Sequence, residues 1–238
     1  DELQRGGLSV IQSDDHFPFS IDAVLLAHFA TLRLRDRVVD LGTGCAVIPL
    51  IMSTRSPHAI VTGLELSPAA ADMATRSIRL NRLENRISIL QGDIREVRNT
   101  MPVGSVDLVT ANPPYLPIGT GDISPADGRS MARHELYCTL DDVIKAAGWL
   151  LRTGGKFALV HRPERLAEII SLCAAVRLEP KRMRLVHPMR GRDANIVLLE
   201  AVKNGKPGMR VEPVIYVHRS DGTYTEEIVT LYGGGTLA

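Results

Sequence analysis

The chain has 238 residues, of which 45% are apolar and 23% charged, and its formal net charge is +1. A chain of this length suits a single domain with a large hydrophobic core. The composition is that of a globular protein, and a charge so near zero excludes a protein coated with phosphate-binding cations. No apolar run reaches the ~18 residues that would span a bilayer.

The three cysteines are Cys45, Cys138 and Cys173. Their number is odd, their spacing matches no metal site, and each stands in a largely apolar stretch. This usage predicts small buried thiols in a reducing cytoplasm, with no metal bound and no disulfide framework.

From about residue 36 onward, short β-branched runs alternate with longer helical patterns, as in a parallel sheet with crossover helices. Strands are expected at 37–41, 59–65, 86–90, 105–110 and 156–160, and helices from 47, over 67–83, over 140–151 and over 164–176. The pattern predicts an α/β, doubly wound sheet that is mostly parallel.

Two further strand-like segments, 181–187 and 194–202, have no helix between them and predict an antiparallel pair. Near the end, 214–218 and 223–228 flank the turn signal at 220–222, which predicts a C-terminal β-hairpin. We expect one compact domain with three parts: an N-terminal segment 1–35, a core 36–205, and a β-rich extension 206–238.

A glycine turn, Asp40-Leu41-Gly42-Thr43-Gly44, follows the first strand. It lacks the third glycine of a dinucleotide fingerprint, because Val47 stands at that position. The carboxylate of Asp40 would repel a pyrophosphate and suits a cationic ligand that carries an amine. The methionine part of S-adenosylmethionine is such a ligand.

Two more acids follow the next two strands, Glu65 after the second and Asp93 after the third. Because the carboxyl ends of parallel strands share one edge, all three acids should line that edge. Glu65 is placed to accept hydrogen bonds from ribose hydroxyls, and Asp93 from an adenine amino group. With the adjoining Leu66 and Ile94, they complete the predicted S-adenosylmethionine site.

The fourth strand ends on the tetrad Asn112-Pro113-Pro114-Tyr115. A planar amino nitrogen lacks a free lone pair, because its lone pair is delocalised. The side-chain oxygen of Asn112 and the carbonyl of Pro113 could hold its two N–H groups and draw it toward tetrahedral geometry. Prolines fix that carbonyl in place, and Tyr115 can stack on the target ring. The tetrad therefore predicts methyl transfer to a planar amine, and Asn112 also borders the cofactor site.

Basic residues concentrate in 177–210, which holds nine Lys/Arg against three acids. A local excess of +6 on a neutral chain fits a nucleic acid gripped on one side, although a solvated surface has the same composition.

Together these motifs resemble the class I methyltransferases of amino groups. Three further stretches, 19–26, 132–135 and 160–166, are similar to the bacterial tRNA(Val) adenine-N6 methyltransferases, which modify the adenine beside the anticodon. The similarity runs from about residue 8 to residue 205. It implies a Rossmann-like class I sheet, S-adenosylmethionine as methyl donor and tRNA as substrate.

By the same resemblance, Phe19 and Ser20 should cover the cofactor pocket from the N-terminal side. One departure is Ala46, where the family usually has glycine, and we expect its methyl group only to narrow the turn slightly. His134 is expected to anchor a loop, because the chemistry needs no base.

Other readings stay open. Guanine-N2 methylation of ribosomal RNA uses the same grip on an amino group. Adenine-N6 methylation of DNA is disfavoured because a target-recognition domain has no room here. Glutamine methylation in proteins is disfavoured because only about 36 residues precede the first strand. A non-catalytic RNA-binding module would not need Asn112. The sequence predicts an RNA substrate, and no membrane or obligate protein partner.

Overall fold

The computed structural model describes residues 2–3, 7–12, 20–113 and 138–233. Nine strands form its main sheet: β3 Arg37–Leu41, β4 Ile60–Glu65, β5 Ile87–Gln91, β6 Val106–Ala111, β7 Leu151–His161, β8 Leu178–Met189, β9 Ile196–Lys203, β10 Arg210–Val211 and β11 Ile215–His218. Their order is β10-β8-β9-β7-β6-β3-β4-β5, and β11 also pairs with β8. The chain winds one way from β3 to β5 and the other way from β6 to β7, so a switch point lies between β3 and β6.

One strand runs against the others. β3, β4, β5, β6 and β7 are mutually parallel, whereas β9 is antiparallel to both of its neighbours, β7 and β8. β8 is thereby parallel to β7, and β10 and β11 pair with β8 in the parallel sense. This confirms the predicted mostly parallel, doubly wound sheet with an antiparallel pair.

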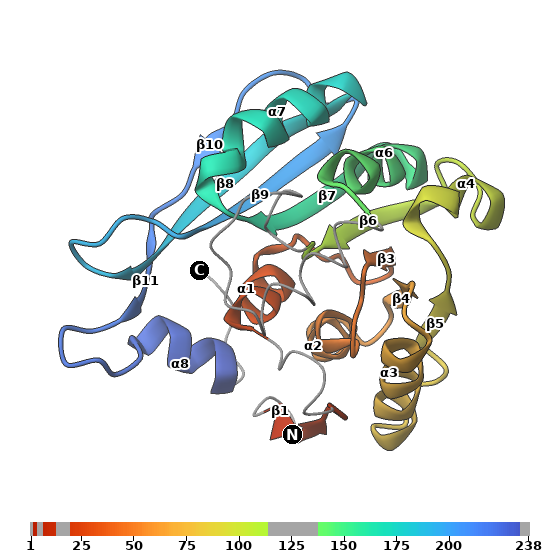
Figure 1. The fold of residues 1–238 in the computed structure, drawn as a ribbon, viewed down its shortest axis with the longest axis horizontal. Coiled ribbons are helices and arrows are strands. Elements are labelled where there is room, and N and C mark those ends of the chain that lie inside the picture. Colours follow the sequence, from red (N-terminus) through yellow and green to blue (C-terminus); the bar gives the residue numbers. More distant parts are fainter. Residues whose placement is uncertain (1, 4–6, 13–19, 114–137, 234–238) are drawn as a thin grey trace, which may run out of the picture.

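The helices cover both faces of the sheet (Figure 1). They are α1 Ile21–Phe29, α2 Val47–Arg55, α3 Pro68–Leu80, α4 Val97–Thr100, α6 Leu140–Leu150, α7 Leu166–Ala175 and α8 Glu226–Gly233, with 3-10 turns η1 Ile94–Glu96 and η2 Pro163–Arg165. A two-residue pair, β1 Glu2–Leu3 with β2 Leu8–Ser9, lies near the N-terminus. In Figure 1, α1, α2, α3 and α8 lie on one side of the sheet, and α6 and α7 on the other.

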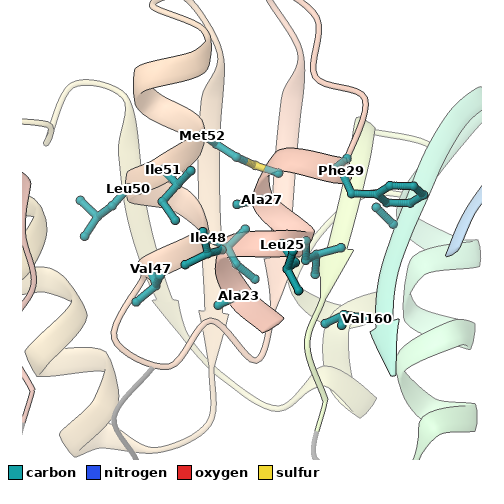
Figure 2. Packing of buried hydrophobic residues seen from close by; sticks show 14 of the residues in the cluster. Ala23, Leu25, Ala27, Phe29, Val47, Ile48, Leu50, Ile51, Met52 and Val160 are labelled. Atoms are coloured by element: carbon teal, nitrogen blue, oxygen red, sulfur yellow. The ribbon is translucent and has the colours of Figure 1, made fainter. Parts of the chain in front are cut away.

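Strand side chains alternate between two cores, because successive residues point to opposite faces. Val38 of β3 packs on the side of α1 and α2, while the next residue, Val39, packs on the side of α6. Figure 2 shows the first of these cores, in which Leu25 of α1 and Ile48 of α2 lie near Val160 of β7. A sheet covered on both faces leaves its strand ends as the place for a site.

α1 is part of this core and not a surface helix. Its residues from Asp22 to Phe29 are buried. The guanidinium of Arg55, at the end of α2, donates to the carbonyls of Ala27 and Ala30, so the C-terminal ends of α1 and α2 lie together. α1 therefore begins on the side where α2 begins, which is the carboxyl edge of the sheet.

The predicted C-terminal hairpin is wrong in its second arm. The turn at 220–222 forms, with Arg219 N–H donating to the Thr223 carbonyl, and one antiparallel bridge joins His218 to Tyr224. The chain then enters α8 at Glu226 instead of continuing as a strand. Ile228 and Leu231, three residues apart, bury the inner face of that helix against α1.

A second difference concerns the connection after the helix predicted over 140–151, where Gly154 and Gly155 stand between that helix and the strand predicted at 156–160 and so predict the end of the helix. α6 ends at Leu150, and β7 begins at Leu151 and includes both glycines. The pairing with β6 shifts register here, from Val106↔Leu151 to Leu108↔Lys156. Gly154 has a φ of 79°, a value that glycine adopts easily, so the glycines permit the irregular backbone at this register shift inside the strand.

Within the described ranges, no helix combines the length and the apolar character needed to cross a membrane.

Candidate active site

The site lies at the carboxyl edge of the sheet, where β3, β4, β5 and β6 end side by side. Register pairs Leu41 with Leu64 across β3 and β4, and Leu41 with Ala111 across β3 and β6. Asp40 and Glu65 are among the last two residues of β3 and β4, and Asp93 and Asn112 come just after β5 and β6. The structure thus brings Asp40, Glu65, Asp93 and Asn112 to one edge, around the switch point.

The glycine turn after β3 is attached to the end of β4. The backbone N–H groups of Gly42 and Thr43 both donate to the carbonyl of Leu64, at 2.9 and 3.1 Å. Gly42 and Gly44 have φ values of 70° and 55°, which glycine adopts without steric cost. The turn therefore requires both glycines for its shape.

Gly63 in β4 also belongs to this site, although the sequence patterns did not indicate it. A Cβ at Gly63 would lie 2.6 Å from Cγ2 and 2.8 Å from Oγ1 of Thr43, and 2.9 Å from Ile89. Thr43 is buried. The missing side chain of Gly63 makes the space into which Thr43 of the turn fits.

Ala46 has a consequence that differs from the expected narrowing of the turn. It precedes α2 with φ 67° and ψ 29°, in the left-handed region. That conformation costs a non-glycine residue roughly 1–2 kcal/mol, because Cβ crowds the backbone. Its methyl group is fully buried in the core on the α1–α2 side. The alanine therefore has a strained backbone, and the packing of its methyl group in the core offsets part of that cost.

Glu65 links the first two strand ends. One carboxylate oxygen accepts from the Gly44 N–H and the other from the Ser67 N–H, both at 2.9 Å. The side chain is 6% exposed. Each carboxylate oxygen can accept more than one hydrogen bond, so the carboxylate is held in place and can still receive two hydroxyl groups.

Asp40 is completely buried next to the turn. Its Oδ1 accepts from the hydroxyl of Thr110 at 2.6 Å, and its Oδ2 has no hydrogen-bond partner among the described residues. Burial raises the pKa of Asp40 to about 7; the hydroxyl groups of Thr110 and Thr43 oppose the rise, and the negative charge of Glu65 adds to it. A buried carboxyl oxygen without a partner is a place where an ammonium donor fits.

Asp93 has a partner that was not expected. Its carboxylate forms a two-pronged pair with the guanidinium of Arg95, at 2.5 and 3.0 Å, and also accepts from the Arg95 N–H. The hydrogen bond from Arg95 is the main cause that lowers the pKa of Asp93. An adenine amino group must share this carboxylate with Arg95 or displace it. The sequence feature that could have indicated this pair is the arginine two residues after Asp93.

Asn112 and Pro113 follow directly after β6, and both are half-buried. Leu66 follows β4 and is 40% exposed, and Ile94 opens η1 after Asp93. Ser20 precedes α1 and therefore lies at the same carboxyl edge of the sheet. Phe19, Pro114, Tyr115 and His134 lie outside the described residues.

Among the residues that the structure describes, no group of three or more His, Cys, Asp or Glu side chains is arranged to hold a metal ion.

The model of the family described as "Methyltransferase small domain" matches residues 20–172, which is more than half of the chain. The chain belongs to this family. With the family it is a methyltransferase that uses S-adenosylmethionine, on the class I fold described above.

Relatives support the same membership. The tRNA1(Val) (adenine(37)-N6)-methyltransferase of Aeromonas salmonicida is 31% identical over 212 residues, covering 88% of this chain and 86% of that protein. The protein with the same name from Tolumonas auensis is 28% identical, with 88% and 86% covered. Among solved structures, a predicted O-methyltransferase from Agrobacterium tumefaciens superposes with a TM-score of 0.73 at 27% identity, covering 91% of this chain and 98% of that one.

The side chains at the edge fit S-adenosylmethionine. The cofactor carries an ammonium group, two ribose hydroxyls and an adenine amino group, all of which donate hydrogen bonds. The acceptors available are the unpartnered Oδ2 of Asp40, the fixed carboxylate of Glu65 and the carboxylate of Asp93. The matching of donors to acceptors supports the predicted roles, which stay predictions residue by residue.

Proposed function

We propose that the chain transfers a methyl group from S-adenosylmethionine to the exocyclic N6 of an adenine in tRNA, in the anticodon loop. The observation that carries the reaction type is the position of Asn112 and Pro113, at the end of β6 and beside the acid-lined edge. The observation that favours the substrate is the name shared by relatives that align over 88% of the chain.

The cofactor would lie across the ends of β3, β4 and β5. Asp40 would take the ammonium of the methionine part, over the turn formed by Gly42, Thr43 and Gly44. Glu65 would accept from the ribose hydroxyls. Asp93, with Leu66 and Ile94 beside it, would hold the adenine, and Ser20 and Phe19 would cover the pocket.

S-adenosylmethionine supplies an electrophilic methyl group on a positively charged sulfur. The remaining task is to make the amino nitrogen a nucleophile. The Asn112 side-chain oxygen and the Pro113 carbonyl would accept its two N–H groups and so localise the lone pair toward the methyl group. Pro114 would limit the movement of that carbonyl, and Tyr115 would stack on the base. The nitrogen loses a proton after transfer, and no general base is required for the transfer step itself.

The function is tested with purified protein and labelled S-adenosylmethionine, with unmodified tRNA, ribosomal RNA, DNA and protein offered in separate reactions. The tRNA is then digested and the methylated nucleoside identified. We expect N6-methyladenosine. N2-methylguanosine from ribosomal RNA, a 2′-O-methylated nucleoside, or label in DNA or protein with none in tRNA would each replace the proposal with another acceptor.

The mechanism is tested with Asn112→Ala. We expect kcat to fall by about 10²–10³-fold, the range seen when one oriented transition-state contact is removed, with cofactor affinity within about twofold of wild type. Asn99→Ala is the matched control, because Asn99 is exposed on α4 and its amide contacts only Glu96 among the described residues. Turnover by Asn112→Ala at the wild-type rate would show that the amino group is activated by other groups.

A further inference from the structure

The nine cations of the basic stretch 177–210 fall into two groups in the structure. Five form ion pairs or hydrogen bonds with other groups of the chain. Arg182 pairs with Glu200 and Glu212, Arg184 with Glu227, and Arg210 with Glu212. Lys181 and Lys203 each donate to a backbone carbonyl, at 3.0 and 2.7 Å. These five side chains bind C-terminal elements together, so the predicted excess of +6 overstates the charge available to a partner.

Four cations remain: Arg177, Arg190, Arg192 and Lys206. All four are exposed, and within the described part of the chain none forms an ion pair. They lie at opposite edges of the sheet. Arg177 precedes β8 and Lys206 follows β9, at the edge away from the site, whereas Arg190 and Arg192 lie in the turn from β8 to β9.

The β8–β9 turn is at the same edge as the site. β8 is parallel to β7 and β6, so its C-terminal end points the same way as the end of β6. β11 extends this end, since His218 pairs with Met189, and the exposed Arg219 follows His218 in the chain. We call residues 187–195 together with 215–219 the distal ribbon. In Figure 1 it projects beyond the neighbouring strands at the left.

The distal ribbon is held by its own contacts. The His187 ring and the Arg192 carbonyl share a hydrogen bond of 2.7 Å. His187 also packs against Tyr216, with ring centroids 5.6 Å apart, and the guanidinium of Arg190 lies 5.9 Å from the centre of the Tyr216 ring. Arg162, which follows β7, donates to the carbonyl of Asn195 at 2.9 Å. The turn is therefore tied both to itself and to the end of β7.

The ribbon is three strand positions from β6, by way of β7 and β9. At about 4.8 Å per position, that is roughly 14 Å from the strand that carries Asn112. Two acids, Asp193 and Asp221, lie at the tips of the same loops, so the surface is a set of separate cations and not a uniform field.

We propose that the distal ribbon binds the phosphate backbone of the RNA substrate, with Arg190, Arg192 and Arg219 as its phosphate contacts. This rests on the proposed function, because it gives the polyanionic substrate a second anchor beside the methyl-transfer site. Phosphate contacts set the position and register of a nucleic acid without reading its sequence. The ribbon therefore helps to bring the target adenine to Asn112.

The test compares two double variants that remove equal charge from the same stretch. Arg190→Gln with Arg192→Gln removes the ribbon cations, and Arg177→Gln with Lys206→Gln removes those at the opposite edge. RNA binding is measured by fluorescence anisotropy with labelled tRNA over a range of salt concentrations, with S-adenosylhomocysteine present, and KM and kcat are measured with the same tRNA.

For the ribbon variant we expect KM for tRNA to rise about tenfold, with kcat nearly unchanged. The slope of log affinity against log salt should become shallower by about 1.4 to 1.8, the value for two lost phosphate contacts. The opposite-edge variant should match wild type in both. Equal effects of the two variants, or none from the ribbon variant, would overturn the proposal and leave only a general charge effect.

Failure of the proposed function gives a different result. If wild type binds tRNA through the ribbon but methylates only another RNA, the binding difference between the two variants persists while the tRNA product is absent. If wild type methylates tRNA and the ribbon variant retains full affinity and the full salt slope, the function stands and the docking surface is wrong.

Discussion

The carboxyl edge of the sheet carries opposite charges on its two halves. β3, β4 and β5 end in the acids Asp40, Glu65 and Asp93, and on the other side of β6 the distal ribbon presents Arg190 and Arg192. Asn112 lies between these halves, at the end of β6. The acidic half suits a small cation, and the basic half suits a polyanion.

The two halves also differ in how their charges are held. Asp40 and Glu65 are buried, and Glu65 is fixed by two backbone N–H groups. The arginines of the ribbon are exposed. Buried charges in fixed geometry discriminate strongly, whereas exposed charges are screened by salt and adapt to a flexible partner. Under the proposed function, this difference predicts that the cofactor is held in one pose and that the RNA is bound by adjustable contacts.

The largest loss of cofactor binding is expected from Glu65→Gln in the acidic half. The variant loses a charged acceptor that orders both the glycine turn and the start of α3, and we expect S-adenosylmethionine affinity to fall about 100-fold, or ~2.7 kcal/mol. Isothermal titration calorimetry measures the cofactor, and tRNA affinity should stay unchanged. Glu84→Gln, an exposed acid before β5, is the control. A parallel loss of tRNA affinity would mean that the two halves are not independent.

The next effect is a pH dependence that belongs to Asp40. Its pKa in the folded chain is about 7, above the ordinary value of 3.8, because the carboxyl is buried. An ammonium ligand favours the ionised form, so cofactor affinity should rise as pH increases toward 7 and level off above it. Below pH 7 the change should approach tenfold per pH unit.

Asp40→Asn supplies the contrast for this pH dependence. Its cofactor affinity should be weak and nearly independent of pH between 5.5 and 8. The same raised pKa has an opposite consequence for the protein without cofactor. The folded state holds a proton that the unfolded state releases, so the contribution of Asp40 to stability is lost as pH rises from about 4 to about 7. A wild-type affinity that does not change with pH would remove Asp40 from the ammonium site.

A smaller effect is expected from Gly63→Ala, which adds a methyl group in β4 against Thr43 of the glycine turn. The added Cβ would lie 2.6 Å from Cγ2 of Thr43, so the turn or the strand must move. We expect a loss of about 1–3 kcal/mol in the free energy of unfolding, measured by urea denaturation, and weaker cofactor binding. Thr43→Ala in the same chain should restore part of the stability, because it removes both clashing atoms of Thr43 and leaves only the contact of 2.9 Å with Ile89. Additive losses in the double variant would locate the clash elsewhere.

The smallest effect concerns Ala46. Glycine would relieve the left-handed strain of roughly 1–2 kcal/mol, but it would lose a buried methyl group and gain freedom in the unfolded chain. Ala46→Gly should therefore lie within about 1 kcal/mol of wild type in stability. Ala46→Val should be much less stable, because a β-branched side chain hardly tolerates a positive φ. Thermal melting of the two variants checks the contrast.

Local patterns predicted the part of the fold that depends on local chemistry. β-branched runs between helical stretches indicated β3 to β7, and the helix predicted over 67–83 is α3, where the Ser67 hydroxyl accepts from the Ala70 N–H and Pro68 is the first helical residue. Gly154 and Gly155 misled because glycine ends helices and also permits irregular strands. The hairpin prediction failed beyond Tyr224 because the burial of Ile228 and Leu231 against α1 is a long-range contact.

The site shows the same division. Acids placed after successive parallel strands could be assigned to one edge from their spacing alone. The partner of Asp93, the fit of Thr43 against Gly63 and the internal pairs of Arg182 and Arg184 depend on which side chains meet after folding. Such contacts turn a net charge of +6 into a few accessible cations, and no count of residues reveals them.

The reversed strand β9 has a consequence for how this protein can vary. Because β9 runs against β7 and β8, the connection between β8 and β9 is a hairpin loop over 190–195 at the carboxyl edge of the sheet, whereas the glycine turn belongs to a different half of the sheet. Hairpin tips accept insertions and new side chains, since the pairing behind them is complete. Replacement of residues 190–195, in evolution or by engineering, could therefore change which polymer the protein binds while the methyl donor stays the same.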